Sequence, residues 1–241
     1  MVIGELLPDL VTIFNITPMV LNLTWSGLLI ISAYLLGSLP TGYLAGRWLK
    51  DIDIREHGSG STGATNILRT VGKGPAVVVL LIDALKGVAA ISLVNGFYTL
   101  TDVSLLPETW QPWLVALAAF AAIFGHSKSI WLNFTGGKSV ATSIGVIFTM
   151  SWPVGLGTVG VFAIVLAISR IVSLSSIAGA IAVSLLMYLT KAPLAYELFG
   201  IAAGIYVIIR HRSNIQRIVT GTEPQIGKPL SPAVSLETGT D

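Results

Sequence analysis

Three clusters of glycine, hydroxyl-bearing and basic residues interrupt an otherwise apolar chain, and their residue types suit the binding of a phosphate group. The first extends from Asp53 to Asn66 and adds Arg69. The second joins Gly125-His126 to Gly136-Gly137-Lys138, and the third extends from Arg210 to Glu223. Glycine permits positive φ, so backbone N–H groups can turn toward one anion, while fixed cations balance its charge. The expected ligand is therefore an anionic metabolite.

The first cluster is the most specific of the three. Its glycines, hydroxyls and amide lie within a few residues of one another, and we expect them to surround an anion: Gly58, Ser59, Gly60, Ser61, Gly63, Thr65 and Asn66. Arg69 follows at a distance that allows a bidentate phosphate contact. The alternative is a flexible loop between helices, which would not need the flanking charges of Asp53, Arg55 and Arg69.

The second cluster contains Gly137-Lys138-Ser139, which resembles the end of a Walker A loop. That motif requires a glycine five residues before Gly137, where this chain has Leu132. What remains is a helix opened by Gly136, Gly137 and Lys138, with its amides and the positive end of its dipole directed at an anion. A basic membrane anchor with a tight turn is the alternative.

The third cluster continues an apolar segment into the headgroup region. His211, Asn214 and Arg217 share one helical face by their i, i+3, i+6 spacing, and we expect Glu223 to pair with a nearby arginine. A polybasic anchor for lipid headgroups is the alternative interpretation.

Two charged residues, Asp83 and Lys86, lie three positions apart inside an apolar segment. Charges there are costly, so the pair is expected to face the interior of a helix bundle. It serves either a substrate or proton path, or mutual neutralisation with a link to a loop. His126 is interpreted as a hydrogen bonder at a helix end, and Ser173 lies where it could reach the same site.

The composition indicates an integral membrane protein. Hydrophobic residues make up 53% of the 241-residue chain and charged residues 11%, with a mean hydropathy of +0.81; soluble domains carry about 25% charged residues. We therefore predict an all-α, polytopic fold of about seven transmembrane helices. The expected ranges are 25–49, 74–97, 110–124, 139–150, 153–168, 174–189 and 194–209. Gly37-Ser38-Leu39-Pro40 predicts a bend in the first.

Lysine and arginine gather in the loops on one side of this arrangement, whereas Lys191 alone lies on the other. The positive-inside rule then predicts an N-terminus outside and a cytoplasmic C-terminus. A five-span reading, with the short segments re-entrant, gives the same sidedness. The expected division is an extracytoplasmic segment at 1–22, one transmembrane domain at 23–223 and a disordered cytoplasmic tail at 224–241.

Several classes of chemistry are disfavoured by what the sequence lacks. The chain has no cysteine, which excludes disulfides and thiolate catalysis. The residues five positions after its three histidines are Thr62, Trp131 and Gln216, so no His-x4-Asp acyltransferase motif is present. There is no Gly-x-Ser-x-Gly elbow and no metal-ligand spacing. The net charge of +2 gives no argument for nucleic acid.

The residues and their order resemble one bacterial membrane family, the acyl-phosphate:glycerol-3-phosphate acyltransferases known as PlsY. The resemblance is carried by Asp53-Ile54-Arg55, Gly58 through Asn66, Arg69, Asp83, Lys86, Gly87, Gly125-His126, Phe134, Gly136-Gly137-Lys138, Val140-Ala141-Thr142, His211, Asn214, Arg217, Gly221 and Glu223. It implies transfer of a fatty acyl group from acyl phosphate to the 1-hydroxyl of sn-glycerol 3-phosphate. Lysophosphatidic acid and inorganic phosphate are the implied products, and the step is the first acylation of phospholipid biosynthesis.

The resemblance, together with the residue types, assigns roles to named positions. The catalytic set is Ser59, Arg69, Lys138, His211 and Asn214. The substrate-binding set is Gly58, Gly60, Ser61, Thr65, Asn66, Gly136, Gly137, Ser173 and Arg217. Asp83, Lys86 and Glu223 are structural, with no metal and no cofactor. The partners are the two phosphate substrates and membrane lipid, at the cytoplasmic face of the bacterial inner (plasma) membrane; the oligomeric state is left open.

Three positions depart from the family pattern, which usually has asparagine at Ser61, proline at Ser129 and glycine at Ser139. Three other interpretations stay open: a transporter of an organic phosphate, a non-enzymatic binder of anionic lipid, and a membrane phosphotransferase.

Overall fold

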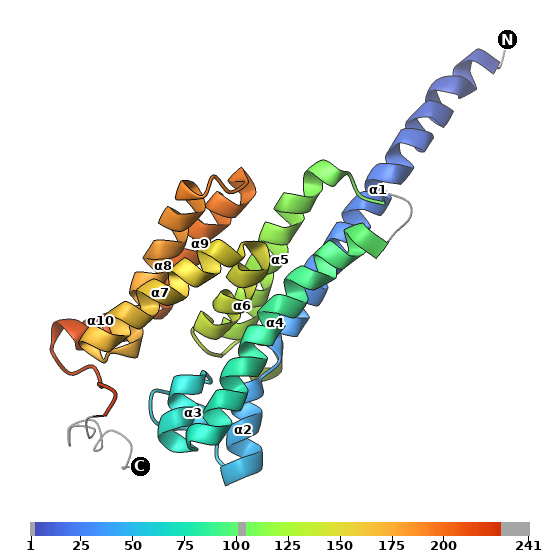
Figure 1. The fold of residues 1–241 in the computed structure, drawn as a ribbon. Coiled ribbons are helices and arrows are strands. Elements are labelled where there is room, and N and C mark those ends of the chain that lie inside the picture. Colours follow the sequence, from blue (N-terminus) through green and yellow to red (C-terminus); the bar gives the residue numbers. More distant parts are fainter. Residues whose placement is uncertain (1–2, 101–104, 228–241) are drawn as a thin grey trace.

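The chain folds as a bundle of helices, shown in Figure 1 as a computed structural model. The structure describes residues 3–100 and 105–227, and of residues 3–17 only the helix they form. The α-helices are α1 (Ile3–Ser38), α2 (Thr41–Lys50), α3 (Ala64–Thr70), α4 (Lys73–Leu100), α5 (Gln111–Ser127), α6 (Val140–Met150), α7 (Trp152–Ser169), α8 (Val172–Leu189), α9 (Leu194–Arg210) and α10 (Arg212–Val219). Three short 3-10 turns are η1 (Ile54–Glu56), η2 (Glu108–Trp110) and η3 (Ile130–Leu132).

The predicted all-α class is confirmed over this part of the chain, where a single antiparallel bridge between Ser129 and Thr135 is the one β pairing. Each of the seven predicted apolar ranges is helical apart from Leu39 and Pro40 in the first and Ser139 in the fourth. The first helix begins at Ile3 rather than near residue 25, because helical hydrogen bonding continues beyond the window that hydropathy marks. Of the tail predicted at 224–241, residues 228–241 lie outside the described part.

Four helical segments in the described ranges are long and apolar enough to cross a membrane: Pro18–Lys50, Lys73–Leu100, Trp152–Ser169 and Val172–Leu189. The pair Leu194–Arg210 and Arg212–Val219, bent by 61°, adds a fifth when it is taken as one span. α5 has 17 residues and α6 has 11, so both are shorter. Large apolar side chains such as Leu81, Ile164 and Ile205 are exposed along these helices, as a lipid-facing surface requires.

The expected bend in the first span is a break between α1 and α2 at Leu39 and Pro40. Proline at the start of α2 lacks the N–H that would continue the helix. The carbonyl of Leu39 accepts the Thr41 N–H at 3.0 Å and the ammonium group of Lys86 at 2.8 Å. The break therefore brings a backbone acceptor within reach of a buried cation.

Small residues let the helices approach closely. A Cβ added at Gly37 of α1 would lie 2.1 Å from the carbonyl oxygen of Ala122 in α5, and one added at Gly145 of α6 would lie 1.9 Å from that of Ala84 in α4. Apolar burial gives little drive for helix association in lipid, so such close packing holds the bundle together.

The three polar clusters meet at one end of the bundle (Figure 1). α1 and α2, α5, α7 and α9 lead toward this end, and α4, α6 and α8 lead away from it. The loops that join them there bring residues 51–63, 128–139 and 210–223 together, although more than half of the sequence separates the first segment from the last.

Candidate active site

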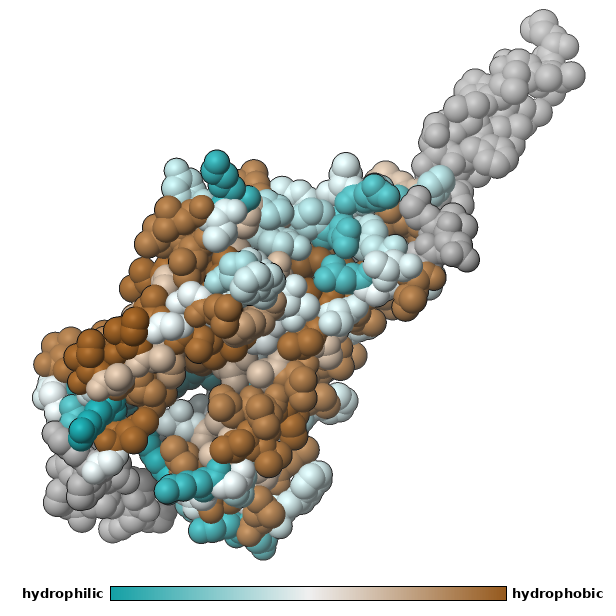
Figure 2. All heavy atoms as spheres, in the orientation of Figure 1, coloured by the Kyte–Doolittle hydropathy of each residue, from teal (hydrophilic) through white to brown (hydrophobic). Residues whose placement is uncertain are grey.

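A cavity of about 590 Å³ opens where the three clusters meet. Its polar wall includes Ser59, Arg69, Lys138, His211 and Asn214, the five predicted catalytic residues. Its other wall is apolar and comes mainly from α4, α6 and α7, with Leu80, Ile144 and Phe162 among the lining side chains. Figure 2 shows a hollow at this end of the molecule, bordered by hydrophilic and hydrophobic side chains. The cavity can therefore hold a molecule that is anionic at one end and apolar at the other.

Asn66 organises the glycine loop from within. Its Nδ2 donates to the carbonyls of Ile54, His57 and Ser61, at 2.9 to 3.1 Å, and its Oδ1 accepts the N–H of Ser59 at 3.0 Å. The side chain is 2% exposed. The amide of Asn66 is thus occupied by the loop, although the residue borders the cavity.

The glycines of this loop have the conformations that the sequence suggested at two positions. φ is +60° at Gly58 and +66° at Gly60, whereas Gly63 has ordinary φ and caps α3. The N–H groups of Ser59, Gly60 and Gly63 all have acceptors inside the loop. These three amides hold the loop in shape, so the expected anion-binding role of the loop amides would fall to other N–H groups of the loop.

Two hydroxyls and one guanidinium of the first cluster are free to meet a ligand. Ser59, Thr65 and Arg69 line the cavity, and within the described residues their side chains make no hydrogen bond or ion pair. Burial lowers the pKa of Arg69, which nonetheless stays charged because guanidinium pKa values are so high. This side of the site offers one cation and two neutral donors.

Lys138 and Asn214 form a direct link between the second and third clusters. The Lys138 Nζ donates to Asn214 Oδ1 at 2.5 Å, and Asn214 Nδ2 donates to Glu223 Oε1 at 2.6 Å. Asn214 therefore bridges Glu223 and Lys138, and the carboxylate helps to position the lysine through this amide. The lysine keeps two further protons for a ligand.

Glu223 accepts hydrogen bonds from three residues on two helices, α8 and α10. Besides Asn214, its Oε1 accepts the hydroxyl of Ser173 at 2.6 Å, and its Oε2 accepts Arg217 Nε at 2.7 Å. The expected pairing with an arginine is present, with Arg217. Burial acts to raise the pKa of Glu223, but these hydrogen bonds outweigh it and hold the pKa below its usual value. A carboxylate so occupied is a structural hub and a poor proton acceptor.

Burial lowers the pKa of Lys138 to about 8. Glu223 opposes this shift, while Arg217, Arg69 and Arg210 add to it. The region is thus rich in positive charge, and a dianionic phosphate would relieve the repulsion among these cations.

His211 lies at the bend between α9 and α10 and is 2% exposed. Its Nδ1 is 2.7 Å from the carbonyl oxygen of Val207. A carbonyl only accepts, so Nδ1 carries a proton and Nε2 is the ring nitrogen available in the cavity.

The second cluster is shaped by two residues outside the predicted site sets. The Arg210 Nη2 donates to the carbonyls of Gly136 at 3.4 Å and Gly137 at 3.1 Å, and the carbonyl of His126 accepts the Gly137 N–H at 3.2 Å. A Cβ at Gly137 would lie 2.2 Å from His126 Nε2. Gly136 and Gly137 therefore shape the loop before Lys138 and do not line the cavity. The sequence analysis did not assign Arg210 to the site, and its position directly before His211 was the one feature that could have indicated this role.

Asp83 and Lys86 form a buried ion pair at 2.8 Å. Thr41 donates to the same carboxylate, and the lysine also contacts His126 Nδ1 at 3.3 Å. Together with the bond from Lys86 to Leu39, this polar group joins α1, α2, α4 and α5. Its contacts favour the structural alternative over a substrate or proton path, although Asp83 borders the cavity.

At each of the three positions where serine replaces the usual residue of the family, the serine hydroxyl makes a hydrogen bond. Ser139 has φ +61°, where glycine would be least strained, and its hydroxyl meets Ser127 at 2.6 Å and the carbonyl of Ile123 at 2.7 Å. The hydroxyl of Ser129 donates to the last carbonyl of α1, at Ser38, over 2.6 Å. Ser61 accepts the N–H of Gly63 at 3.3 Å, within the loop.

Of the predicted substrate-binding residues, Ser61, Thr65, Asn66 and Ser173 line the cavity with the catalytic set, whereas Gly58, Gly60, Gly136, Gly137 and Arg217 lie behind it. Lys86 also lies outside the lining. The sequence did not single out Lys73 or Ser176, which border the cavity.

Comparison with known proteins agrees over most of the chain. The sequence model of the glycerol-3-phosphate acyltransferase family matches residues 27–221. A glycerol-3-phosphate acyltransferase of Trichormus variabilis is 63% identical over 215 residues, covering 87% of this chain and 95% of the relative. One from Rippkaea orientalis is 60% identical over 206 residues, covering 86% and 95%.

Two solved structures have a similar fold. Both are crystal structures of PlsY, an integral membrane glycerol 3-phosphate acyltransferase. The glycerol 3-phosphate form has a TM-score of 0.75 and 35% identity, covering 84% of this chain and 96% of that one. The lysophosphatidic acid form has a TM-score of 0.72 and 34% identity, covering 84% and 95%.

Proposed function

Because the chain belongs to the glycerol-3-phosphate acyltransferase family, we propose that it transfers a fatty acyl group from acyl phosphate to the 1-hydroxyl of glycerol 3-phosphate. The class of reaction and the acceptor follow from the family, and the similar structures are described with glycerol 3-phosphate and lysophosphatidic acid. The acyl phosphate donor is what the resemblance of the sequence motifs implies, and a cavity with a cationic end and an apolar wall supports it.

One observation carries this proposal: a single cavity joins a cationic end, with Lys138 and Arg69, to an apolar wall. Both substrates carry a phosphate, and only one carries a fatty chain. An activated acyl phosphate needs no enzyme nucleophile, so positioning and charge stabilisation are sufficient. This fits a chain that has no cysteine and a site in which Glu223, whose charge acts on Lys138, already accepts three hydrogen bonds.

In the proposed reaction, the hydroxyl oxygen of glycerol 3-phosphate forms a bond to the acyl carbonyl carbon. The bond from that carbon to the phosphate oxygen breaks, and phosphate leaves with the electron pair. The hydroxyl proton passes to the departing phosphate, which is the nearest strong acceptor. Lysophosphatidic acid and inorganic phosphate result, with atoms and charges balanced.

The residues divide into those that hold phosphate and those that orient the acceptor. Lys138 and Arg69 neutralise phosphate and stabilise the negative charge that develops at the reacting centre. The free hydroxyls of Ser59 and Thr65 donate neutral hydrogen bonds from the opposite loop. His211 presents Nε2 to the glycerol moiety, because its Nδ1 is held by a backbone carbonyl.

We further propose that Asn66, Gly136, Gly137 and Arg217 act through the loops they support, rather than by contact with substrate. The hydrogen bonds of Asn66 and the packing of Gly137 on His126 motivate this. Ser173 contributes indirectly through Glu223, since its hydroxyl already donates there.

The proposed orientation has the N-terminus outside, seven crossings and the active site at the cytoplasmic face of the bacterial inner membrane. Alternating helix directions support it (Figure 1), as does the collection of lysine and arginine at the end that bears the cavity. Reagents that label lysine from one side of oriented vesicles would test it: an impermeant reagent outside should modify Lys191 and spare Lys50.

The function is tested with purified protein in detergent, palmitoyl phosphate and glycerol 3-phosphate, following both phosphate release and lipid product. Product from palmitoyl phosphate, and none from palmitoyl-CoA, is expected. Phosphate release without lysophosphatidate would contradict transfer, and no reaction from a folded sample, combined with flux of glycerol 3-phosphate across sealed vesicles, would favour a transporter.

Lys138→Met should lower kcat by about 100- to 1000-fold, the usual effect of removing one charge-stabilising donor. Lys128→Met is the matched control, because Lys128 lies in the same loop but does not line the cavity. Equal activities of the two variants would contradict the role of Lys138.

A further inference from the structure

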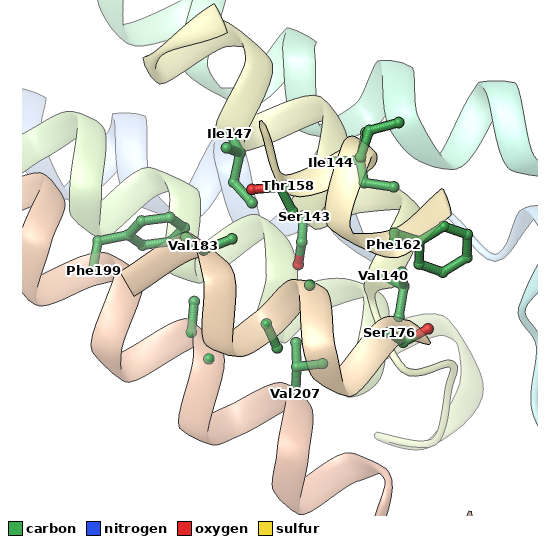
Figure 3. Close-up of a pocket in the computed structure, with 15 residues that line it drawn as sticks. Val140, Ser143, Ile144, Ile147, Thr158, Phe162, Ser176, Val183, Phe199 and Val207 are labelled. Carbon is green, nitrogen blue, oxygen red and sulfur yellow. The ribbon is translucent and has the colours of Figure 1, made fainter. Parts of the chain in front are cut away.

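A second, smaller cavity of about 40 Å³ lies between α6, α7, α8 and α9, shown in Figure 3. Its walls are mainly aliphatic and aromatic, with Ile147, Val183 and Phe199 at one end. None of the residues assigned to phosphate binding lines it.

The small cavity adjoins the active-site cavity. Five residues line both: Val140, Ile144, Val159, Phe162 and Ser176. A chain that leaves the polar end of the large cavity along its apolar wall therefore reaches the small one next.

Two hydroxyl groups interrupt the apolar wall of the small cavity. Ser143 Oγ and Thr158 Oγ1 are buried and have no hydrogen-bond partner within the described residues. The two residues are only 8% and 6% exposed. Neighbouring helical hydroxyls behave differently: those of Ser176 and Thr149 donate to the carbonyl four residues earlier. In Figure 3, Ser143 and Thr158 lie between the shared residues Val140 and Phe162 and the apolar end at Phe199.

We propose that this small cavity receives the methyl end of the substrate's acyl chain and that Ser143 and Thr158 set which chain lengths are preferred. The proposal rests on the proposed function, because it assumes a fatty acyl substrate in the adjoining cavity. It names a site for the chain terminus and two residues that determine specificity.

The physical argument has two opposing parts. Each methylene that enters an apolar cavity gains affinity, about fourfold per group. The two hydroxyl oxygens, however, are buried and have no hydrogen-bond partner among the described residues, so a methylene that packs against them gains less affinity than one that packs against an apolar wall. Chains that end before the hydroxyls keep the full gain for each methylene, whereas longer chains do not.

Gly179→Ala tests the cavity directly. An added Cβ would lie 3.6 Å from Thr158 Cγ2, an ordinary van der Waals contact, so the methyl group enters the cavity without a clash. Gly200→Ala is the matched control: it is also buried and helical, its nearest neighbours would be 3.5 Å away, and it lines neither cavity.

The measurement is kcat/KM with palmitoyl phosphate and with lauroyl phosphate, for both variants and the unmodified protein. Gly179→Ala should lower the palmitoyl-to-lauroyl ratio by about fourfold for each methylene displaced, and Gly200→Ala should leave it unchanged. An unchanged ratio in Gly179→Ala, or an equal change in the control, would overturn the proposal.

The double variant Ser143→Ala with Thr158→Val should shift the ratio in the opposite direction, toward the longer chain, because it removes both unpartnered hydroxyls with little change of shape. Thermal stabilisation of each variant by palmitoyl and lauroyl lysophosphatidate provides a readout without turnover. If the unmodified protein does not acylate glycerol 3-phosphate, that result contradicts the proposed function only. The dependence of thermal stabilisation on chain length then still tests whether the small cavity binds the chain end. Equal stabilisation by both lipids in all variants would refute it.

Discussion

The lowered pKa of Lys138 leads to a specific dependence of activity on pH. Burial brings this pKa from 10.5 to about 8, so the ammonium form is largely present at pH 7 and largely lost by pH 9. If the cation binds substrate phosphate, kcat/KM should fall about tenfold between these pH values, since it reports the ionisation of the free enzyme. The substrate phosphates lose their last proton near pH 6, well below this window.

The sign of the neighbouring charge can be tested with Glu223→Gln. The carboxylate raises the pKa of Lys138, so its removal should lower that pKa further and move the fall in kcat/KM to lower pH. Glutamine can still accept the hydrogen bonds of Asn214 and Ser173. The variant therefore removes the charge and the contact with Arg217, whose donor cannot bond to the glutamine NH2 group, while the acceptor for Asn214 and Ser173 is kept.

The assay is steady-state kinetics from pH 6 to pH 10, with phosphate release measured at several concentrations of each substrate. Lys138→Arg is the control, because its guanidinium stays charged over the whole range and should remove the inflection even if activity is lower. A fall at the same pH in Glu223→Gln, or an unaltered inflection in Lys138→Arg, would refute the assignment to Lys138.

Three further predictions concern the support of the site. Asn66→Ala leaves four loop groups without their partner and should lower stability by about 2–4 kcal/mol along with activity, measured as Tm in detergent and as turnover; a Tm within error of the unmodified protein would contradict it. Gly37→Ala would place a Cβ 2.1 Å from a carbonyl oxygen of α5 and should destabilise by about 1–3 kcal/mol, whereas Gly27→Ala, with nothing within 4 Å, should not; equal unfolding midpoints would argue against this packing. Arg210→Gln should lower kcat more than Arg212→Gln, because only the first arginine holds the glycine carbonyls before the catalytic lysine; equal kcat values would remove that role.

The five residues proposed as catalytic, which line one cavity, could be singled out because their residue types are unusual in their setting. Lys138, Arg69 and His211 stand out against a chain with 11% charged residues, and helical spacing puts His211 and Asn214 on one face. What could not be predicted is that Asn214 lies between Lys138 and Glu223. That contact joins loops 76 residues apart in sequence and depends on how α6 meets α10.

For the glycines too, the sequence indicates which positions are special, and the structure indicates what each glycine contacts. The sequence identifies Gly58, Gly60, Gly136 and Gly137 as special, but substrate contact and loop shaping both favour glycine there. Only the structure separates them, because it shows the Gly137 N–H on the carbonyl of His126 and the glycine carbonyls on Arg210. The role of Arg210 itself was missed, since a basic residue at a helix end is equally typical of a lipid anchor.

Taken by itself, the sequence determined the all-helical membrane class, the seven apolar segments, the break at Leu39 and Pro40, and the polar residues that were found to line the large cavity. These follow from local properties: hydropathy, helix-breaking geometry and the rarity of charge in lipid. The tertiary structure alone decided which polar groups are already satisfied, as with Asn66, and which remain free, as with Ser59. It also decided that the hydroxyls of Ser143 and Thr158, beside a cavity, have no hydrogen-bond partner among the described residues, because satisfaction of a polar group depends on neighbours that helix packing brings together from distant parts of the chain.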